Sequence, residues 1–229
     1  MITPLAYACP PLDNGHAQPK AFFILYIMKN RPNTSYTETP IRVAILIDGG
    51  YFIKRYNAMY NKSGNKTAST IANDLYTISH SHVGKNNYLY RIFYYDCVPF
   101  SKKVHNPISN KCIDFSKTEE ALYRNELINE LKKKRKLALR LGHIKESKRW
   151  MFYDNAMKKL LKKEISLDDI QDTDVYYELR QKGIDMKIGV DIASLALKGF
   201  VDKIVLISGD SDFVPAAKLA RREGIDFVL

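Results

Sequence analysis

The chain has 229 residues, of which 45% are hydrophobic, and 36 Lys and Arg against 25 Asp and Glu give it a net charge of +11. This size and apolar content can bury a sizeable core and favour one domain with extra segments over two full domains. The apolar run at residues 21–28 is far shorter than the roughly 20 residues of a membrane-spanning helix, so we expect no membrane span. The excess of positive charge favours a polyanionic partner without identifying it.

Residues 1–40 read as an irregular leader. They contain six of the nine prolines of the chain and show no sustained hydrophobic period. Such a stretch cannot bury enough apolar surface to offset the entropy of ordering it, so we expect it to be disordered. We expect the ordered domain to span residues 41–229.

From there, strand and helix patterns alternate. In chain order, the expected elements are a buried strand at 42–47, helices at 51–60 and 67–79, an aromatic-rich strand at 89–95, a long charged helix at 117–136, a strand at 137–144, a short basic amphipathic stretch at 151–163, a strand at 174–180, a helix at 191–198, a buried strand at 203–207, a helix at 212–223 and a strand at 225–229. Strands separated by helices predict right-handed crossovers and a mainly parallel sheet. Because the last apolar run reaches Leu229 with no polar closure, we expect a C-terminally truncated fold.

The three cysteines predict a reducing compartment. Cys9, Cys97 and Cys112 form no Cys-x-x-Cys pair and no even set. Disulfide frameworks of secreted proteins use such even sets, so we expect a cytoplasmic protein.

Acidic residues follow the two buried strands. Asp48 comes directly after the first strand, and Asp210 and Asp212 follow the second within Ser-Gly-Asp-Ser-Asp. Ligand sites of parallel sheets form beyond the carboxyl ends of the strands, so these acids converge if the two strands are neighbours. Clustered carboxylates are accommodated by a hard divalent cation such as Mg²⁺ or Mn²⁺. An acidic metal site on a basic protein suggests cleavage of phosphodiester backbones.

Each acid also has a purely structural explanation. Asp48 can cap the helix that follows it, and Asp210 can cap the turn before the next helix. Caps do not explain why acids recur at the same end of two strands. Asp185 and Asp191 are further candidates, each of which is a cap or a ligand, and Asp96, at the end of the strand at 89–95, is another candidate for the site.

The positive charge is concentrated in one segment. Residues 131–163 hold thirteen Lys and Arg against two acidic residues, which accounts for the whole net charge. This segment is either a solvated Lys-rich surface or a contact for nucleic acid.

Three stretches carry a family resemblance. Ile-Asp-Gly-Gly-Tyr-Phe at 47–52, Lys-Gly-Ile-Asp-Met-Lys-Ile-Gly-Val-Asp-Ile at 182–192 and Leu-Ile-Ser-Gly-Asp-Ser-Asp-Phe-Val-Pro at 206–215 resemble the NYN domain family of the PIN-like nuclease superfamily, and in particular its LabA-like branch. The resemblance covers residues 41–229, with a basic inserted segment at about 100–170 that matches only loosely. Many family members have Asn where this chain has Tyr51.

The resemblance implies a Rossmann-like, PIN-like three-layer α/β sandwich with a ribonuclease centre that depends on Mg²⁺ or Mn²⁺. Carried over by position, Asp48, Asp191 and Asp210 are the implied catalytic and metal-binding acids, with Asp212 and Asp185 as supporting metal ligands.

We therefore predict a metal-dependent endoribonuclease that binds RNA. The expected nucleic-acid contacts are Lys132, Lys133, Lys134, Arg135 and Lys136. The main alternative is a non-catalytic nucleic-acid-binding or regulatory module on the same fold. A phosphatase of the haloacid dehalogenase type needs a second Asp two positions after the first, where this chain has Gly50. The sequence does not separate RNA from DNA, and it leaves a homo-oligomer open.

Overall fold

The computed structural model describes residues 39–229. The expected disordered leader at 1–40 therefore lies, apart from its last two residues, outside the described part of the chain. Within residues 39–229 no helix is both long and apolar enough to cross a membrane.

The described domain contains strands, α-helices and short 3₁₀ turns. The strands are β1 (Arg42–Asp48), β2 (Tyr88–Cys97), β3 (Lys103–His105), β4 (Cys112–Asp114), β5 (Leu137–Phe152), β6 (Val175–Lys182), β7 (Lys203–Ile207) and β8 (Asp226–Val228). The α-helices are α2 (Gly49–Tyr60), α3 (Ala68–Ser81), α4 (Glu119–Lys132), α5 (Asp154–Leu161), α6 (Ile184–Leu197) and α7 (Val214–Arg222). Short 3₁₀ turns at Phe115–Lys117 and Ser211–Phe213 precede α4 and α7.

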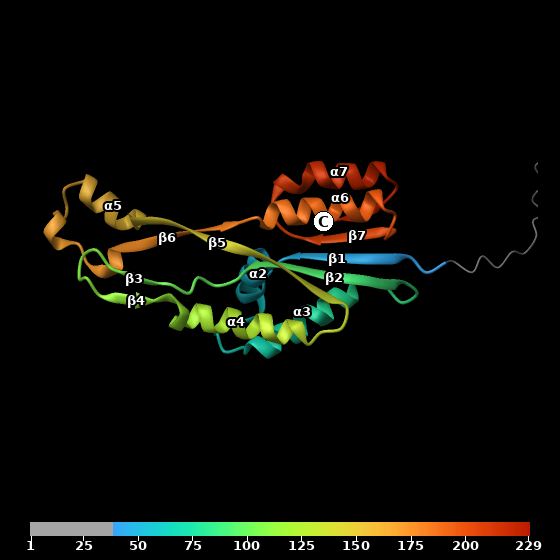
Figure 1. Ribbon diagram of the computed structural model, residues 1–229, viewed down its shortest axis with the longest axis horizontal. Helices are drawn as coiled ribbons and strands as arrows, with labels where there is room; N and C mark the ends of the chain where they lie inside the picture. The colour runs from blue at the N-terminus through green and yellow to red at the C-terminus, as the bar shows by residue number, and fades with distance from the viewer. Residues whose placement is uncertain (1–38) are drawn as a thin grey trace, which may run out of the picture. The chain divides into compact units, whose positions relative to one another are not determined.

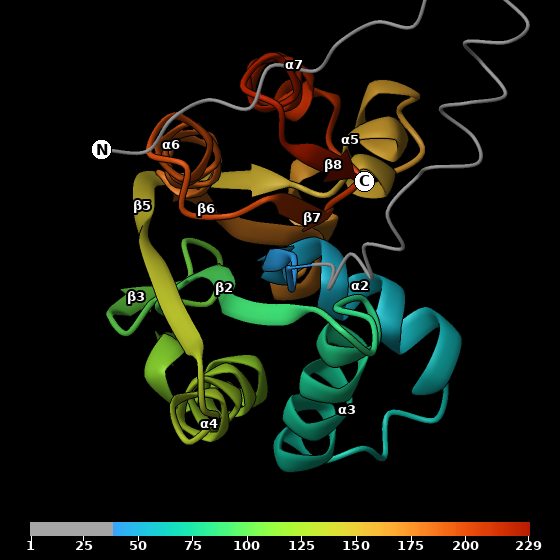
Figure 2. The same cartoon turned by 90° about the vertical axis from the view of Figure 1, so that its right-hand side faces the viewer.

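Six of the strands form one sheet in the order β6-β5-β2-β1-β7-β8. All neighbours are parallel except β5 and β6, which are antiparallel. Helices α6 and α7 cover one face of the sheet, and α2, α3 and α4 lie on the other (Figure 2). The prediction of a three-layer α/β sandwich with a mainly parallel sheet is confirmed.

The sheet separates two apolar cores, and β1 contributes to both. Ala44 and Leu46 pack toward α6 and α7, whereas Val43, Ile45 and Ile47 pack toward α2 and α3. All five side chains are fully buried. A central strand that is covered on both faces reads as a continuous apolar run, which is why its position was predictable from sequence.

Helix α6 begins seven residues earlier than the sequence pattern predicted. Gly183 adopts a φ of +84° at the junction with β6, a conformation that favours glycine, and the helix starts at Ile184. Ile184, Ile188 and Ile192 then repeat every four residues and are buried against the sheet. As a result Asp185 lies in the first turn and Asp191 lies well inside the helix.

Strand β5 is also longer than predicted, and its second half continues beyond the end of β2. Its first residues, Leu137–Gly142, pair with β2, and His143–Phe152 pair with β6. Together with α5 these residues form an extension at 143–182, which we call the arm, and the β3–β4 hairpin lies beneath it in Figure 1. This hairpin was not predicted from sequence.

Candidate functional site

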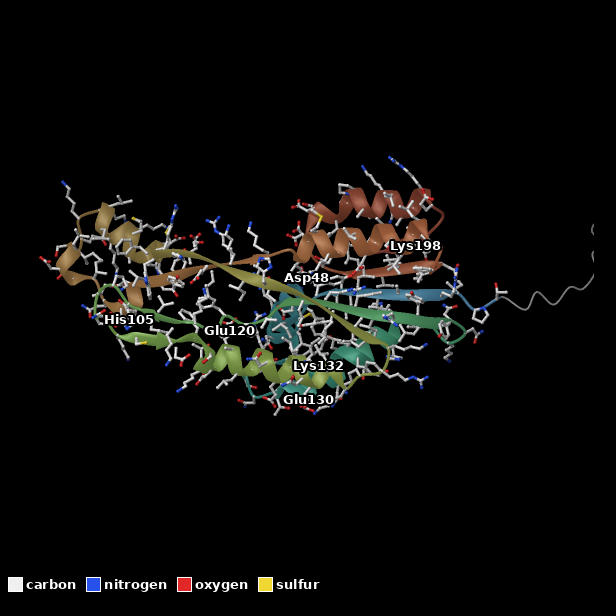
Figure 3. The ribbon with its side chains drawn as sticks, in the orientation of Figure 1. Asp48, His105, Glu120, Glu130, Lys132 and Lys198 are labelled. Atoms are coloured by element: carbon white, nitrogen blue, oxygen red, sulfur yellow. The ribbon has the colours of Figure 1, made fainter. Side chains whose placement is uncertain are left out.

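Asp48 ends β1 at the carboxyl edge of the sheet, at the centre of Figure 3. Its side chain caps α2, because Asp48 Oδ1 accepts a hydrogen bond from the backbone nitrogen of Tyr51 at 3.2 Å. The Ser208 hydroxyl donates to Asp48 Oδ2 at 3.3 Å. The cap therefore exists, and it occupies only one of the two carboxylate oxygens.

Asp210 and Asp212 follow β7 at the same edge. The backbone nitrogen of Asp210 donates to Ser208 Oγ at 3.3 Å, and the backbone nitrogen of Asp212 donates to Asp210 Oδ1 at 2.9 Å. Both acidic residues are exposed. The turn after β7 thus holds two carboxylates beside the one that ends β1.

Asp185 adds a carboxylate from a third element. Burial raises the pKa of the Asp185 carboxyl above its ordinary value, and repulsion from the carboxylates of Asp210, Asp48 and Asp212 raises it further. Asp185 itself lies in the first turn of α6, which begins beside the carboxyl end of β2, because a Cβ atom at Gly142, the partner of Cys97, would lie 2.9 Å from Ile184 Cδ1. We call Asp48, Asp185, Asp210 and Asp212 the acidic cluster.

Asp191 is engaged elsewhere, which differs from its expected place among the core acids. Its Oδ2 accepts hydrogen bonds from the Tyr95 hydroxyl at 2.8 Å and from Arg140 Nε at 2.9 Å. The physical reason is the early start of α6, which places Asp191 six residues and about 9 Å of helix rise beyond Asp185. Asp191 links α6 to β2 and β5 as one partner of an ion pair.

Asp96 is the last residue but one of β2 and follows Tyr95, which is opposite Asp48, but it is buried and paired. Arg124 Nη1 lies 3.0 Å from Asp96 Oδ1 and 3.2 Å from Asp96 Oδ2. Burial raises the pKa of the Asp96 carboxyl, although the nearby Arg124 guanidinium favours its charged form. Arg124 was missed in the sequence because nothing in the pattern of α4 marks a side chain that reaches back to β2.

The acidic cluster offers carboxylate oxygens from three elements to a divalent cation. Among residues 39–229, no three His, Cys, Asp or Glu side chains are close enough to hold one metal ion jointly. The donors themselves are hard carboxylate oxygens, which suit Mg²⁺ and Mn²⁺. Mg²⁺ usually keeps several waters and takes only one or two carboxylates, so this more open arrangement still fits such an ion.

Comparison with known proteins bears on the same region. The family model for the NYN domain matches residues 115–229, half of the chain. The chain belongs to the NYN domain family. The matched part contains Asp185, Asp210 and Asp212, while Asp48 lies before it. No curated protein and no solved structure matched the chain.

The NYN domain is generally nuclease-like, so the positions of basic side chains matter for substrate binding. The segment predicted to bind nucleic acid, Lys132–Lys136, lies between α4 and β5. Its side chains contact nearby groups; for example, Lys136 Nζ donates to the carbonyl oxygen of Leu89 at 2.6 Å. Because β5 starts at Leu137 and runs parallel to β2, this segment lies roughly 16 Å from the carboxyl edge, at about 3.3 Å per strand residue.

Other basic residues of this NYN domain lie beyond the carboxyl edge, on one face of the arm. Lys145 is directly opposite Arg180 in the pairing of β5 with β6. A shallow hollow of about 320 Å³ lies on this face. It is lined by Lys145 and Arg180 together with Arg149, Lys182, Glu146, Ser147 and Glu178. Arg180 is paired with Glu178 of the same hollow, with 2.9 Å between Arg180 Nε and Glu178 Oε1, so its charge is already partly offset, whereas Lys145, Arg149 and Lys182 add positive charge to this surface. The sequence could not reveal this surface, because it depends on the register between two strands.

Proposed function

We propose that the chain is a metal-dependent endoribonuclease that hydrolyses RNA phosphodiester bonds. What supports the proposal is the acidic cluster, whose carboxylates come from the end of β1, the first turn of α6 and the turn after β7, at the carboxyl edge of the sheet. Membership of a nuclease-like family supports the same conclusion.

The proposed ligand set differs from the one implied by sequence resemblance. Asp48, Asp185 and Asp210 would hold Mg²⁺ or Mn²⁺, with Asp212 in support. Asp191 would instead link α6 to β2 and β5. Asp185 is preferred because it lies in the first turn of α6, whereas the Asp191 carboxylate is already ion-paired with Arg140.

The chain's own residues would prepare this site in two ways. The α2 cap and the Ser208 hydroxyl fix the orientation of the Asp48 carboxylate. Mutual repulsion among the acids disfavours the fully charged cluster, which makes binding of a positive ion favourable. A bound divalent cation would lower the pKa of a coordinated water and offset charge on the phosphate oxygens.

RNA is proposed as the substrate, with its backbone held by the basic face of the arm. Lys182 ends β6 three residues before Asp185, so this surface leads directly to the acidic cluster. Lysine and arginine contacts to phosphates supply most of the sequence-independent affinity of such proteins.

A second candidate is a non-catalytic nucleic-acid-binding module on the same fold. The observation in its favour is that no three potential ligands among residues 39–229 are close enough to hold a metal together. Under this alternative the arm would bind RNA, and the acids would serve as caps and helix-start charges.

Cleavage assays separate the two functions. Single-stranded RNA is incubated with the full chain in Mg²⁺ or Mn²⁺, with EDTA as the control, and with Asp48→Asn in parallel. We expect cleavage only with the metal and the unaltered chain, and nearly unchanged RNA affinity for Asp48→Asn. Binding without any metal-dependent cleavage would favour the non-catalytic module.

A further inference from the structure

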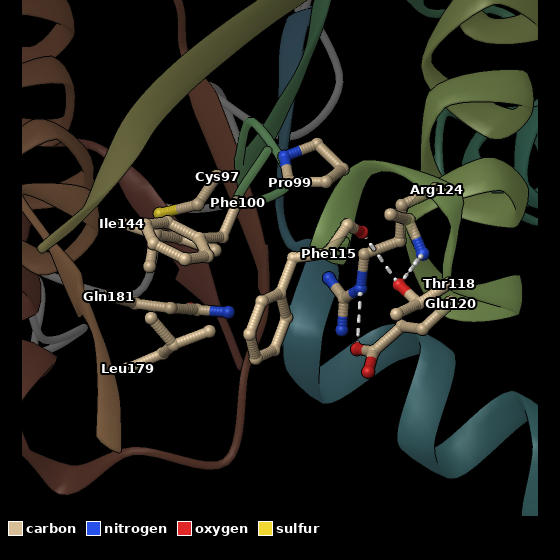
Figure 4. Close-up of a pocket in the computed structure, with 11 residues that line it drawn as sticks. Cys97, Pro99, Phe100, Phe115, Thr118, Glu120, Arg124, Ile144, Leu179 and Gln181 are labelled. Carbon is tan, nitrogen blue, oxygen red and sulfur yellow. Dashed lines mark hydrogen bonds and ion pairs between the residues drawn. The ribbon is translucent and has the colours of Figure 1, made fainter. Parts of the chain in front are cut away.

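A pocket of about 310 Å³ lies between the start of the arm and the N-terminal part of α4 (Figure 4). Its walls come from the end of β2, the hairpin segment, α4, β5 and β6. The residues that carry the argument are Cys97, Phe100, Phe115, Arg124 and Gln181. The volume is sufficient for a flat heterocyclic ring.

The pocket adjoins the acidic cluster on two sides. Arg124 in its wall forms the ion pair with Asp96, which follows Tyr95, the residue opposite Asp48 in the pairing of β1 with β2. Cys97 in the opposite wall is paired with Gly142, where a Cβ atom would lie 3.1 Å from Cys97 Sγ and 2.9 Å from Cδ1 of Ile184, the residue before Asp185. A nucleic-acid strand with a phosphate at the acidic cluster would therefore have the pocket within reach of a neighbouring nucleotide.

The walls offer the two kinds of contact that single-stranded bases use. Phe100 and Phe115 are only half-buried and meet edge to face, with ring centroids 5.3 Å apart and planes inclined by 72°. The Gln181 side chain points toward the Phe115 ring in Figure 4. Within the described part of the chain, its amide makes no side-chain hydrogen bond. Bases bind proteins by stacking on aromatic rings and by hydrogen bonds along their edges.

Both rings also pack against the arm, because the ring centroid of Tyr177 in β6 lies 6.1 Å from that of Phe100 and 6.0 Å from that of Phe115. The ring of Phe52, which has a structural role in the core, is 6% exposed. Phe100 and Phe115 instead remain half-buried beside a hollow that also receives a polar amide. Apolar walls with a few convergent polar groups are typical of small-ligand sites.

We propose that this pocket binds one nucleobase of the single-stranded RNA whose phosphate lies at the acidic cluster. The base stacks on Phe115, and the Gln181 amide bonds to its edge. The inference rests on the proposed function for the identity of the strand, and it adds a subsite that selects an unpaired nucleotide beside the scissile bond.

The test is a binding titration with the full chain in EDTA, so that no cleavage takes place. The probe is a short single-stranded oligoribonucleotide with 2-aminopurine at one position, compared with the same strand carrying an abasic site there. We expect quenching of the 2-aminopurine fluorescence on binding. Phe115→Leu keeps an apolar side chain but removes the ring, so it should lose the quenching and weaken binding about tenfold. The abasic strand should bind both proteins equally.

Two further variants make the result specific. Tyr176→Leu removes a partly exposed ring from β6 outside the pocket, and it should bind like the unaltered chain. Gln181→Ala changes an exposed residue, so it serves as the test if Phe115→Leu does not fold. Gln181→Ala should weaken binding of the base-containing strand and leave binding of the abasic strand unchanged. Equal quenching and affinity in all variants, or equal losses in Tyr176→Leu, would overturn the subsite.

The same samples distinguish this inference from the proposed function. Metal-dependent cleavage without any effect of Phe115 or Gln181 would remove the subsite and leave the nuclease. Quenching that depends on Phe115, without cleavage in Mg²⁺ or Mn²⁺, would keep the subsite and remove the nuclease. A chain that binds no RNA oligonucleotide would overturn both.

Discussion

The Ser208 hydroxyl donates a hydrogen bond to Asp48 across 160 residues of sequence, with 3.3 Å between Ser208 Oγ and Asp48 Oδ2. The two residues follow paired positions, because Ile47 of β1 is directly opposite Ile207 of β7. This contact joins the two acidic motifs at one edge of the sheet. It also orients the Asp48 carboxylate toward the turn that holds Asp210.

The first turn of α2 contains two neighbouring glycines, Gly49 and Gly50, and we expect an added methyl group to be tolerated only at Gly50. A Cβ atom at Gly49 would lie 2.6 Å from the Tyr94 ring and 2.7 Å from the backbone oxygen of Tyr95. Gly49→Ala should therefore destabilise the fold by about 1–3 kcal/mol, as overpacking does. Gly50→Ala is the matched control, because its nearest atom would be 3.5 Å away. Urea unfolding checks both, and equal stabilities would contradict the close packing.

Divalent cations should stabilise the unaltered chain more than a variant of the acidic cluster. A ligand that binds only the folded state raises the melting temperature. Mg²⁺ or Mn²⁺ should raise the Tm of the unaltered chain, and should raise it less for Asp210→Asn. Thermal unfolding followed by circular dichroism provides the measurement, with Ca²⁺-free buffer and EDTA as the reference. Identical shifts in both proteins would mean that Asp210 does not bind the metal.

The ion pair at the start of β1 should make stability depend on pH at the acidic end. Arg42 Nη2 lies 2.8 Å from Asp202 Oδ1, and this hydrogen bond lowers the pKa of the Asp202 carboxyl below its ordinary value. A lowered pKa gives stabilisation that is present above the unfolded-state pKa and is lost as the pH falls through the folded-state pKa. Asp202→Asn should thus lower the Tm slightly at neutral pH, since both partners are half-exposed. The difference should disappear once the pH falls below the folded-state pKa of Asp202; a constant difference would argue against the ionic contribution.

Two sets of four basic side chains, one on the arm and one between α4 and β5, can be compared for their contribution to RNA binding. Replacing Lys145, Arg149, Arg180 and Lys182 by Ala should weaken RNA binding and flatten its salt dependence, by roughly 0.7 log units per lost phosphate contact on a single strand. Replacing Lys132, Lys133, Lys134 and Arg135 removes the same charge near the amino edge of the sheet, and should change the slope less. Fluorescence anisotropy across a salt series measures both. A larger effect of the second set would restore the contact predicted from sequence and remove the arm from the RNA path.

The parts of the fold set by local pattern were predictable. Strand β7 begins and ends at the expected residues, because a short apolar run between turn residues specifies a buried strand. The start of α6 was missed, since Lys-Gly-Ile-Asp reads as a turn until the left-handed Gly183 is seen to connect β6 directly to the helix. The ion pair of Arg140 with Asp191 joins residues 51 apart, and no local pattern marks it.

The central claim is that Asp185, rather than Asp191, belongs to a metal-dependent RNA cleavage site. The most direct test is the cleavage rate of single-stranded RNA in Mg²⁺ or Mn²⁺ for Asp185→Asn and Asp191→Asn, each compared with the unaltered chain. We predict that Asp185→Asn lowers the rate by about 100-fold or more, as expected for loss of a group that acts on the reacting centre. Asp191→Asn should lower the Tm and keep most of the rate. Loss of cleavage in Asp191→Asn with retention in Asp185→Asn would contradict the account.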